Sequence, residues 1–404
     1  MLLWLGLLVG GLSAGACLVG LLVAPRRIES IAVLGTLLSA LLAVRSFSAI
    51  ARASDTHGIG LAVFFLAAGM TGGYWVAAAA LLRSEGPAPR TPPVDPRPVR
   101  VLPAVIVLSC AEAPRYRIAS TARVVDRLVS SGAVRLPTSA LPFVFLSEKT
   151  RYRALGGYNP ARATVTAIAD GIAREIDGLA ETVEVAWCDS TPNLRAVVAD
   201  LGGRGYRSVV LLMLGPDGSF PMWQAERNAL PDMSPIRLTR APSIWHSDEL
   251  ARRLADRIIA TTSGVAPSNV GVVLAGEGQP TVWTSVAEDW SERENYFNQR
   301  VRLMLAERGI DECHVLMSWI EWQTPDITES VRHLAALGCR RIVIAPSTLP
   351  YLTLASALDL KHLISAARLP DDVLVVTLTP WGDDASIVHA AAKAVRDALE
   401  RLAR

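Results

Sequence analysis

The sequence predicts an α/β fold made of two similar parallel-sheet halves that face a shared cleft, preceded by three transmembrane helices. Three observations support this prediction. Apolar runs fill most of the first 82 residues, predicted strands and helices alternate from about residue 101, and one strand–helix–strand unit occurs twice. Such alternation is typical of parallel sheets that are covered by helices.

Three N-terminal runs are apolar enough to cross a membrane. Leu2–Ala24 and Ile59–Leu82 each have the roughly 20 residues that a spanning helix needs. Ile31–Val44 is shorter, but it is extended by Arg45 and by the mildly polar Ser46–Ala51. A cleaved signal peptide is the alternative for the first run, yet that run lacks a basic N-terminal region and further spans follow.

Basic residues indicate the orientation of these spans. Arginines lie in the first loop and after the third span, at Arg26, Arg27, Arg83, Arg90, Arg97 and Arg100, whereas the second loop carries Arg45 and Arg52. This excess favours a multi-pass protein of the inner (cell) membrane whose soluble domain is cytoplasmic. No span has an ionisable residue at its centre, so we interpret the membrane part as an anchor or oligomerisation element.

The predicted domain boundaries follow from composition. Residues 1–83 form the transmembrane region, 84–100 a proline-rich linker, 101–265 the first α/β half and 266–404 the second. The 40 basic and 38 acidic residues give no electrostatic case for binding nucleic acid. The five cysteines form no CxxC pair, so we expect free buried thiols in a reducing compartment.

An internal repeat supports the two halves. Val185–Leu214 and Met317–Ala345 both run from a strand ending in Trp, through an acidic residue and Thr-Pro, to a helix and a second strand. The spacing from Thr-Pro to the following glycine is equal in the two copies. Thr-Pro is interpreted as the first turn of each helix, where the missing N–H of proline has no cost.

One strand end stands out in each half. In Gly271–Pro280, GVVLAGEGQP, an apolar strand stops at a turn that presents Glu277. Ala104–Pro114, AVIVLSCAEAP, is a weaker copy that presents Glu112. Ligands of open α/β sheets bind at the carboxyl ends of the strands, so these residues are candidate site carboxylates.

Four segments from residue 101 onward carry a family resemblance. RYRALGGYNP at Arg151–Pro160, the strand and turn at Trp187–Pro192, GEGQP at Gly276–Pro280 and the strand end at Trp319–Pro325 resemble, in this order, motifs of the ferrochelatases, within the class II tetrapyrrole chelatases. The resemblance implies a chelatase-like fold and a lyase that inserts Fe²⁺ into a porphyrin in heme biosynthesis. Fe²⁺ and porphyrin would be substrates, and no bound prosthetic group is implied.

The chain departs from this family at the histidines. Glu277 stands where the family's HGxP motif has histidine, and Asp217 stands at the corresponding position of a first-half loop. Carboxylates accept protons and bind divalent cations. We therefore expect Glu277 and Glu112 to be catalytic and Glu277 and Asp217 to bind metal. The alternative is that Glu277 is a solvated or capping carboxylate left after an active site decayed.

Aromatic and polar side chains near the strand ends are candidates for holding a macrocycle. Of the tryptophans there, we expect Trp187, Trp319 and Trp322 to provide flat faces, although burial in an α/β core is the alternative. Arg153 and Asn159, in the RYRALGGYNP segment, are the candidate polar contacts, and an arginine there would pair with a propionate. A solvated basic face is the alternative for the arginine.

Three functions therefore stay open. The first is a membrane-anchored ferrochelatase-like enzyme. The second is a catalytically inactive chelatase-fold protein that binds or carries a tetrapyrrole, and the third is a membrane scaffold subunit. The expected partners are a tetrapyrrole and the membrane itself, with a homo-oligomer or a membrane-complex partner as a further expectation and no nucleic acid.

Overall fold

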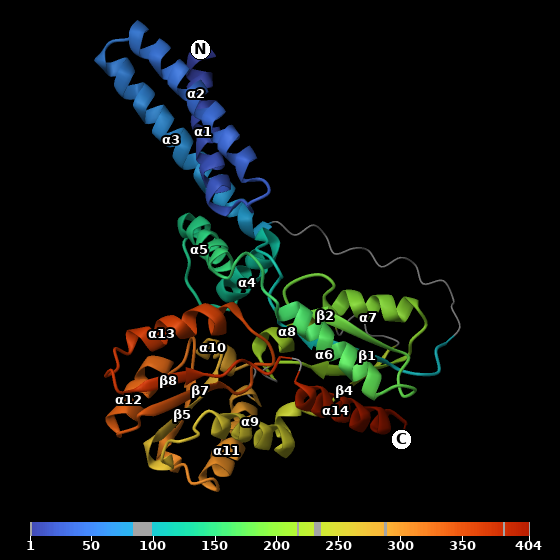
Figure 1. Ribbon diagram of the computed structural model, residues 1–404. Coiled ribbons are helices and arrows are strands. Elements are labelled where there is room, and N and C mark those ends of the chain that lie inside the picture. The colour runs from blue at the N-terminus through green and yellow to red at the C-terminus, as the bar shows by residue number, and fades with distance from the viewer. Residues whose placement is uncertain are drawn as a thin grey trace. The chain divides into compact units, whose positions relative to one another are not determined.

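The computed structural model describes residues 2–83, 99–215, 218–229, 236–286, 289–382 and 384–403. These residues form two compact units (Figure 1). The first unit holds the described residues of Met1–Ala88 and Arg115–Gly157, and the second holds those of Pro89–Pro114 and Tyr158–Arg404. Apart from Val99 and Arg100, the predicted linker lies outside the described residues.

The first unit begins with three long apolar helices, as predicted. They are α1 (Leu2–Val23), α2 (Glu29–Ala53) and α3 (Thr56–Ala80), which continues into the short 3-10 turn η1 (Leu81–Arg83). Each is long and apolar enough to cross a membrane. Glycine permits the close contact of α1 with α3, because a Cβ atom at Gly73 would lie 1.9 Å from the Leu12 carbonyl oxygen.

Two further helices of the first unit come from an insertion that follows the first strand. These are α4 (Ile118–Ser130) and α5 (Leu141–Ala154), joined through the turn η2 (Thr138–Ala140). Together with α1, α3 and η1 they form a small apolar core made of Val19, Val23, Ala78, Leu81, Ala122, Val125, Leu141 and Phe145. The sequence predicted α4 but not α5, whose apolar residues are interrupted by Ser147, Glu148 and Lys149.

The second unit contains two four-stranded sheets whose strands are all parallel. The first has the order β2-β1-β3-β4, with β1 (Ala104–Ser109), β2 (Thr182–Trp187), β3 (Ser208–Met213) and β4 (Arg237–Arg240). The second has the equivalent order β6-β5-β7-β8, with β5 (Val270–Gly276), β6 (Val315–Trp319), β7 (Arg341–Pro346) and β8 (Leu374–Thr377). The predicted α/β class and the repeat are both confirmed.

Helices follow the strands in both halves. The first half has α6 (Ala161–Glu175), α7 (Leu194–Gly203), α8 (Phe220–Ala229), the turn η4 (Ile244–His246) and α9 (Asp248–Ala260). The second half has the turn η5 (Pro267–Asn269), α10 (Thr281–Thr284), α11 (Asp289–Ala306), the turn η6 (Glu312–His314), α12 (Ile327–Ala336), a π turn (Ala355–Asp359), α13 (Leu360–Ala366) and α14 (Ala385–Ala403).

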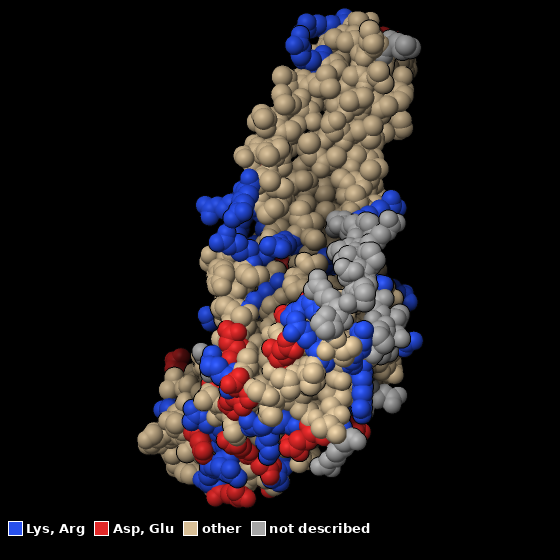
Figure 2. Space-filling view, turned by 90° about the vertical axis from the view of Figure 1, so that its right-hand side faces the viewer, with Lys and Arg blue, Asp and Glu red and all other residues tan. Residues whose placement is uncertain are grey.

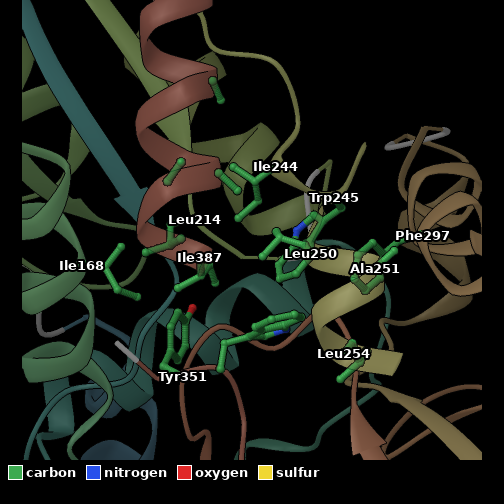
Figure 3. Close-up of a cluster of buried hydrophobic side chains, with 14 of the residues drawn as sticks. Ile168, Leu214, Ile244, Trp245, Leu250, Ala251, Leu254, Phe297, Tyr351 and Ile387 are labelled. Carbon is green, nitrogen blue, oxygen red and sulfur yellow. The ribbon is translucent and has the colours of Figure 1, made fainter. Parts of the chain in front are cut away.

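The closing helix of each half packs on the other half. Helix α9 contacts α11 and β7, and α14 contacts α6 and β3 (Figure 1). The contact of α14 with α6 is close, because a Cβ atom at Gly171 would lie 2.7 Å from Val388 Cγ1. The largest apolar core therefore takes side chains from both halves, among them Ile168, Trp245, Phe297 and Ile387 (Figure 3).

The structure corrects two local predictions. Pro192 and Pro325 do not start helices; each follows a cis peptide bond and precedes the residue that caps the helix, Asn193 or Asp326. The cysteine prediction is also wrong, because Cys110 and Cys188 form a disulfide. Ser109 of β1 pairs with Trp187 of β2, so the next residue of each strand lies beside its partner.

The free thiols differ from one another in exposure. Cys17 and Cys339 are at least partly buried, whereas Cys313 is exposed. The expectation of buried thiols is therefore also wrong for Cys313.

Candidate functional site

The carboxyl ends of the two sheets are joined by direct hydrogen bonds. The Glu112 carboxylate, after β1, accepts from the backbone N–H of Leu354, 3.0 Å away in the second half, and from Asn159 Nδ2 at 2.8 Å. Asn159 is buried, and its Oδ1 accepts from the Ala161 N–H at the start of α6. Glu112 and Asn159 thus hold the strand ends and the α6 start together.

Tyr351 lies between the same strand ends. Its side chain is buried in the large core, and a Cβ atom at Gly215 would lie 3.8 Å from its hydroxyl (Figure 3). Burial raises the pKa of the Tyr351 hydroxyl, and the charges of Glu277 and Glu112 raise it further. Hydrogen bonds with Ser109 and with the Cys110 backbone lower this pKa, but burial outweighs them, so the hydroxyl stays protonated.

The turn that carries Glu277 is fixed on both sides. The Glu277 carbonyl accepts from the Glu321 N–H at 3.0 Å, and Gln279 Oε1 accepts from the Phe220 N–H at 3.1 Å. Gly278 has φ 87°, and a Cβ atom there would lie 2.0 Å from the Glu321 carbonyl oxygen. Only glycine fits this position, so the sequence GEGQP presents a half-buried Glu277 at the end of β5, as predicted.

A second carboxylate borders this turn and was not predicted. Glu294 of α11 is 3% exposed, and a Cβ atom at Gly276 would lie 2.6 Å from its Oε1. Burial raises the pKa of Glu294 to about 7, although the Thr348 hydroxyl, which donates to Oε1, and the Trp319 indole lower it. A carboxyl group with this pKa both accepts and releases protons near neutral pH.

Several buried polar atoms on α11 and in the strand-end loops of the second half have no hydrogen-bond partner. Within the described part of the chain, this group comprises Gln279 Nε2, Glu294 Oε2, Asn298 Oδ1 and Nδ2, Trp319 Nε1 and Ser347 Oγ. The Trp319 indole is near enough to affect the Glu294 carboxyl but lies outside hydrogen-bonding geometry. Buried polar groups in native proteins nearly always have partners, so this cluster indicates bound water or a polar ligand.

The sequence signal for this cluster was present but ambiguous. Glu294 and Asn298 lie four residues apart, so they share the face of α11 that also carries Phe297 and Val301. A polar pair among apolar residues on one helical face indicates a buried polar site. In a helix rich in charged residues, this pair is easily interpreted as part of the solvated face.

The predicted metal ligands are only partly described. Asp217 lies outside the described residues, so the predicted pair of Glu277 with Asp217 stays a prediction. In the part of the chain that the structure describes, no group of three His, Cys, Asp or Glu side chains is placed to hold a metal ion.

The predicted macrocycle contacts are scattered. Trp187 is buried under the Arg162 guanidinium, which lies 4.5 Å from its ring centre, whereas Trp322 is 46% exposed and has φ 67°. Trp319 lies at the polar cluster. Arg153 belongs to the first unit, where its guanidinium pairs with both Glu29 oxygens at 3.0 Å.

An aromatic stack joins the two halves near the Glu277 turn. Phe220, at the start of α8, stacks on Trp283 of α10 with ring centres 4.8 Å apart and on Trp223 at 5.5 Å. The Arg227 guanidinium lies 5.1 Å from the Trp223 ring. Phe220 and Trp283 are buried, while Trp223, which packs against Phe220 and Arg227, is partly exposed, so Trp223 is the ring of the stack that reaches the surface.

Comparison with known proteins gives one family match and several similar folds. Residues 291–398 match the sequence model of the CbiX family. This supports a relationship of the second half to the class II tetrapyrrole chelatases, but it does not show ferrochelatase in particular. Among curated proteins, none matches the chain.

Similar solved structures include SirB from Bacillus subtilis with Fe³⁺, at 12% identity and TM-score 0.48, covering 75% of this chain and 98% of that one. The sirohydrochlorin chelatase SirB from Bacillus subtilis subspecies spizizenii with cobalt has 10% identity and TM-score 0.47, and the match covers 74% of this chain and 97% of that one. DR2241 from Deinococcus radiodurans, a multi-domain protein with structural similarity to chelatases, has 14% identity and TM-score 0.44, covering 74% and 55%.

Proposed function

We propose that this protein is a membrane-anchored tetrapyrrole chelatase that removes the macrocycle protons with carboxylates instead of histidines. The observation that supports this most is the buried Glu294, with its pKa raised to about 7 among unpartnered polar atoms beside the Glu277 turn. Glu294 also lies within the segment that matches CbiX.

The reaction requires a proton acceptor. When a divalent metal binds the four macrocycle nitrogens, two N–H bonds break and two protons leave, while the metal keeps its charge and no electrons are exchanged. About half of Glu294 is ionised near pH 7, so it accepts one proton readily. Glu277 is half-buried at the turn beside it and is the group that passes protons to solvent.

The substrates of this reaction are proposed from the resemblance and from ligand chemistry. Fe²⁺ with a porphyrin in heme biosynthesis remains our first choice, since Fe²⁺ tolerates oxygen ligands although imidazole suits it better. We also keep a multi-pass location in the inner membrane with the second unit in the cytoplasm, which the arginine pattern supports. A cytoplasmic location would keep Cys110 and Cys188 reduced, so the state of that pair in cells tests the orientation.

The alternative function is tetrapyrrole binding without turnover. The hydrogen bonds of Glu112 to Asn159 and to Leu354 favour it, because they occupy one of the two predicted catalytic carboxylates with a structural role. On this alternative, the polar cluster around Glu294 would hold water or a polar substituent of the macrocycle.

An absorption titration separates the two functions. The full chain in detergent is mixed with protoporphyrin or coproporphyrin, and Zn²⁺ or, without oxygen, Fe²⁺ is then added. We expect binding followed by the spectral change of metal insertion, with Glu277→Gln slowing insertion about 10²-fold and leaving binding intact. Glu249→Gln, an exposed change on α9, is the matched control. Binding without insertion would establish the alternative, and no binding would contradict both.

A further inference from the structure

The first unit fixes the insertion helices at one end of the membrane helices. The Tyr116 hydroxyl donates to the Val23 carbonyl at 3.0 Å, close to the end of α1, and the Tyr74 hydroxyl of α3 donates to the Ser139 carbonyl at 2.6 Å. The shared apolar core of α1, α3, α4 and α5 lies at the same end. Because the apolar helices stop at this end, a membrane crossed by α1, α2 and α3 would have its headgroups at the level of α4 and α5.

An ion pair between the buried Lys149 and the partly exposed Glu29 holds α5 in this position. Lys149 has only 4% of its side chain exposed, and its ammonium group lies 3.2 Å from Glu29 at the start of α2 and 3.4 Å from the Leu21 carbonyl. Arg153, one turn further along α5, pairs with the same carboxylate. These contacts neutralise Glu29, the acidic residue at this end of α2.

The insertion is strongly basic although the whole chain is nearly neutral. Residues 115–157 contain eight Lys and Arg but two Asp and Glu, whereas the whole chain contains 40 and 38. At this end of the bundle the exposed arginines are Arg26, Arg27, Arg83, Arg115, Arg117, Arg135 and Arg153, which we call the juxtamembrane basic surface. Figure 2 shows Lys and Arg gathered where the apolar surface of the bundle ends, with few Asp or Glu among them.

Exposed apolar side chains accompany these arginines. Phe143 on α5 is 57% exposed, and Ile28, between Arg27 and Glu29, is 46% exposed. Arginines beside exposed apolar side chains are typical of segments that lie in the interface of a membrane with anionic lipids. A soluble anion would match the arginines but would leave Phe143 and Ile28 in water.

We propose that the juxtamembrane basic surface binds the headgroups of anionic phospholipids. In this proposal α4 and α5 bind lipid headgroups, in addition to the anchoring by the spanning helices. This goes beyond the proposed function and does not depend on it. Each arginine at an anionic surface adds to the attraction, and the attraction falls within a Debye length, so it is sensitive to salt.

The test compares the lipids that stay with the full chain. The protein is reconstituted in vesicles of equal phosphatidylcholine and phosphatidylglycerol and extracted mildly, and the retained lipids are counted by mass spectrometry. We expect about threefold or greater enrichment of phosphatidylglycerol, which falls towards one in 1 M NaCl, where the Debye length is about 3 Å. The triple change Arg115→Gln, Arg117→Gln, Arg135→Gln should abolish it.

Two control variants separate lipid binding from net charge and from misfolding. Arg115→Lys, Arg117→Lys, Arg135→Lys should keep the enrichment, since the charge is retained. Arg252→Gln, Lys361→Gln, Lys393→Gln removes three exposed charges from the second unit and should also keep it. Equal enrichment in the wild type and the Arg→Gln variant, or an equal loss in the second-unit control, would overturn the proposal.

Discussion

At the residue scale, the chemistry of the site depends on the contrast between Glu277 and Glu294. Glu277 was predictable, because glycines and a proline around a strand end mark a turn that presents a side chain. Glu294 was not predictable, because its pKa of about 7 arises from burial against Gly276, a contact that only the packing of α11 on β5 creates. Sequence patterns identify turns more readily than they identify buried charges.

Burial of Glu294 predicts a dependence of stability on pH. In the unfolded chain its pKa is near 4.5 and in the folded protein it is about 7, so the folded state holds the proton more tightly. Stability from this group is fully present below pH 4.5 and is lost as pH rises to about 7, a change on the order of 3 kcal/mol. Relative to the wild type, Glu294→Gln should therefore have a higher unfolding midpoint at pH 8 than at pH 5.

Thermal unfolding of the full chain at both pH values checks this expectation, with Glu249→Gln as the exposed control. If the difference in unfolding midpoint between the wild type and Glu294→Gln is the same at pH 5 and pH 8, the assignment of a neutral, buried carboxyl group is contradicted.

Glu112 is expected to matter for stability. Glu112→Ala leaves the Leu354 N–H and the Asn159 amide without their acceptor, which costs about 1–3 kcal/mol for each group that stays buried. Glu112→Gln keeps one acceptor oxygen and should lose less. Unfolding midpoints measure this, and binding of porphyrin should stay within a factor of two. Loss of insertion with unchanged stability would instead support the catalytic role that the sequence suggested for Glu112.

At the element scale, the loops that follow the strands bring together side chains that lie far apart in the sequence. Alternation predicted most strands, because their apolar runs are bounded by turns, but it missed β4, whose RLTR sequence is polar and partly exposed at a sheet edge. The sequence analysis named Trp187 as a macrocycle contact, and this stays a prediction; its ring is buried beside the Arg162 guanidinium. The Phe220–Trp223–Trp283 stack was not predicted because it forms between elements of different halves.

The stack predicts which tryptophan holds a macrocycle. Trp223→Ala should raise the Kd for porphyrin about tenfold, because it removes the accessible ring of the stack. Trp322→Ala, a change of another exposed ring at a strand-end loop, should have a smaller effect. Quenching of porphyrin fluorescence measures both. A larger rise in Kd for Trp322→Ala than for Trp223→Ala would support the sequence-based choice of Trp322 and contradict a role of the stack in holding the macrocycle.

The disulfide between the ends of β1 and β2 predicts sensitivity to reductant. The two cysteines are 78 residues apart in the sequence, so the chain-entropy account gives the bond as much as about 4.5 kcal/mol of stabilisation. Reductant should lower the unfolding midpoint of the wild type and leave that of Cys110→Ser, Cys188→Ser unchanged. Equal midpoints with and without reductant would show that the pair is not bonded in solution.

At the scale of the whole molecule, the sequence predicted the three long apolar helices and the two sheets, but it did not predict how the elements group. Residues 115–157 lie between two parts of the α/β unit in sequence and nevertheless pack with the long apolar helices α1 and α3. Helices α9 and α14 each pack on the opposite half. Periodicity shows which face of a helix is buried, but it does not show which partner buries it.

The central claim, metal insertion with a carboxylate of pKa about 7, is tested most directly by the pH dependence of insertion. The initial rate for the full chain is measured from pH 5.5 to 8.5 with saturating porphyrin and Zn²⁺, for wild type and Glu294→Gln. We predict a wild-type rate that rises through about pH 7 and a variant rate that is about 10²-fold lower without that rise. No insertion by the wild type at any pH, or identical profiles for the two proteins, would contradict the claim.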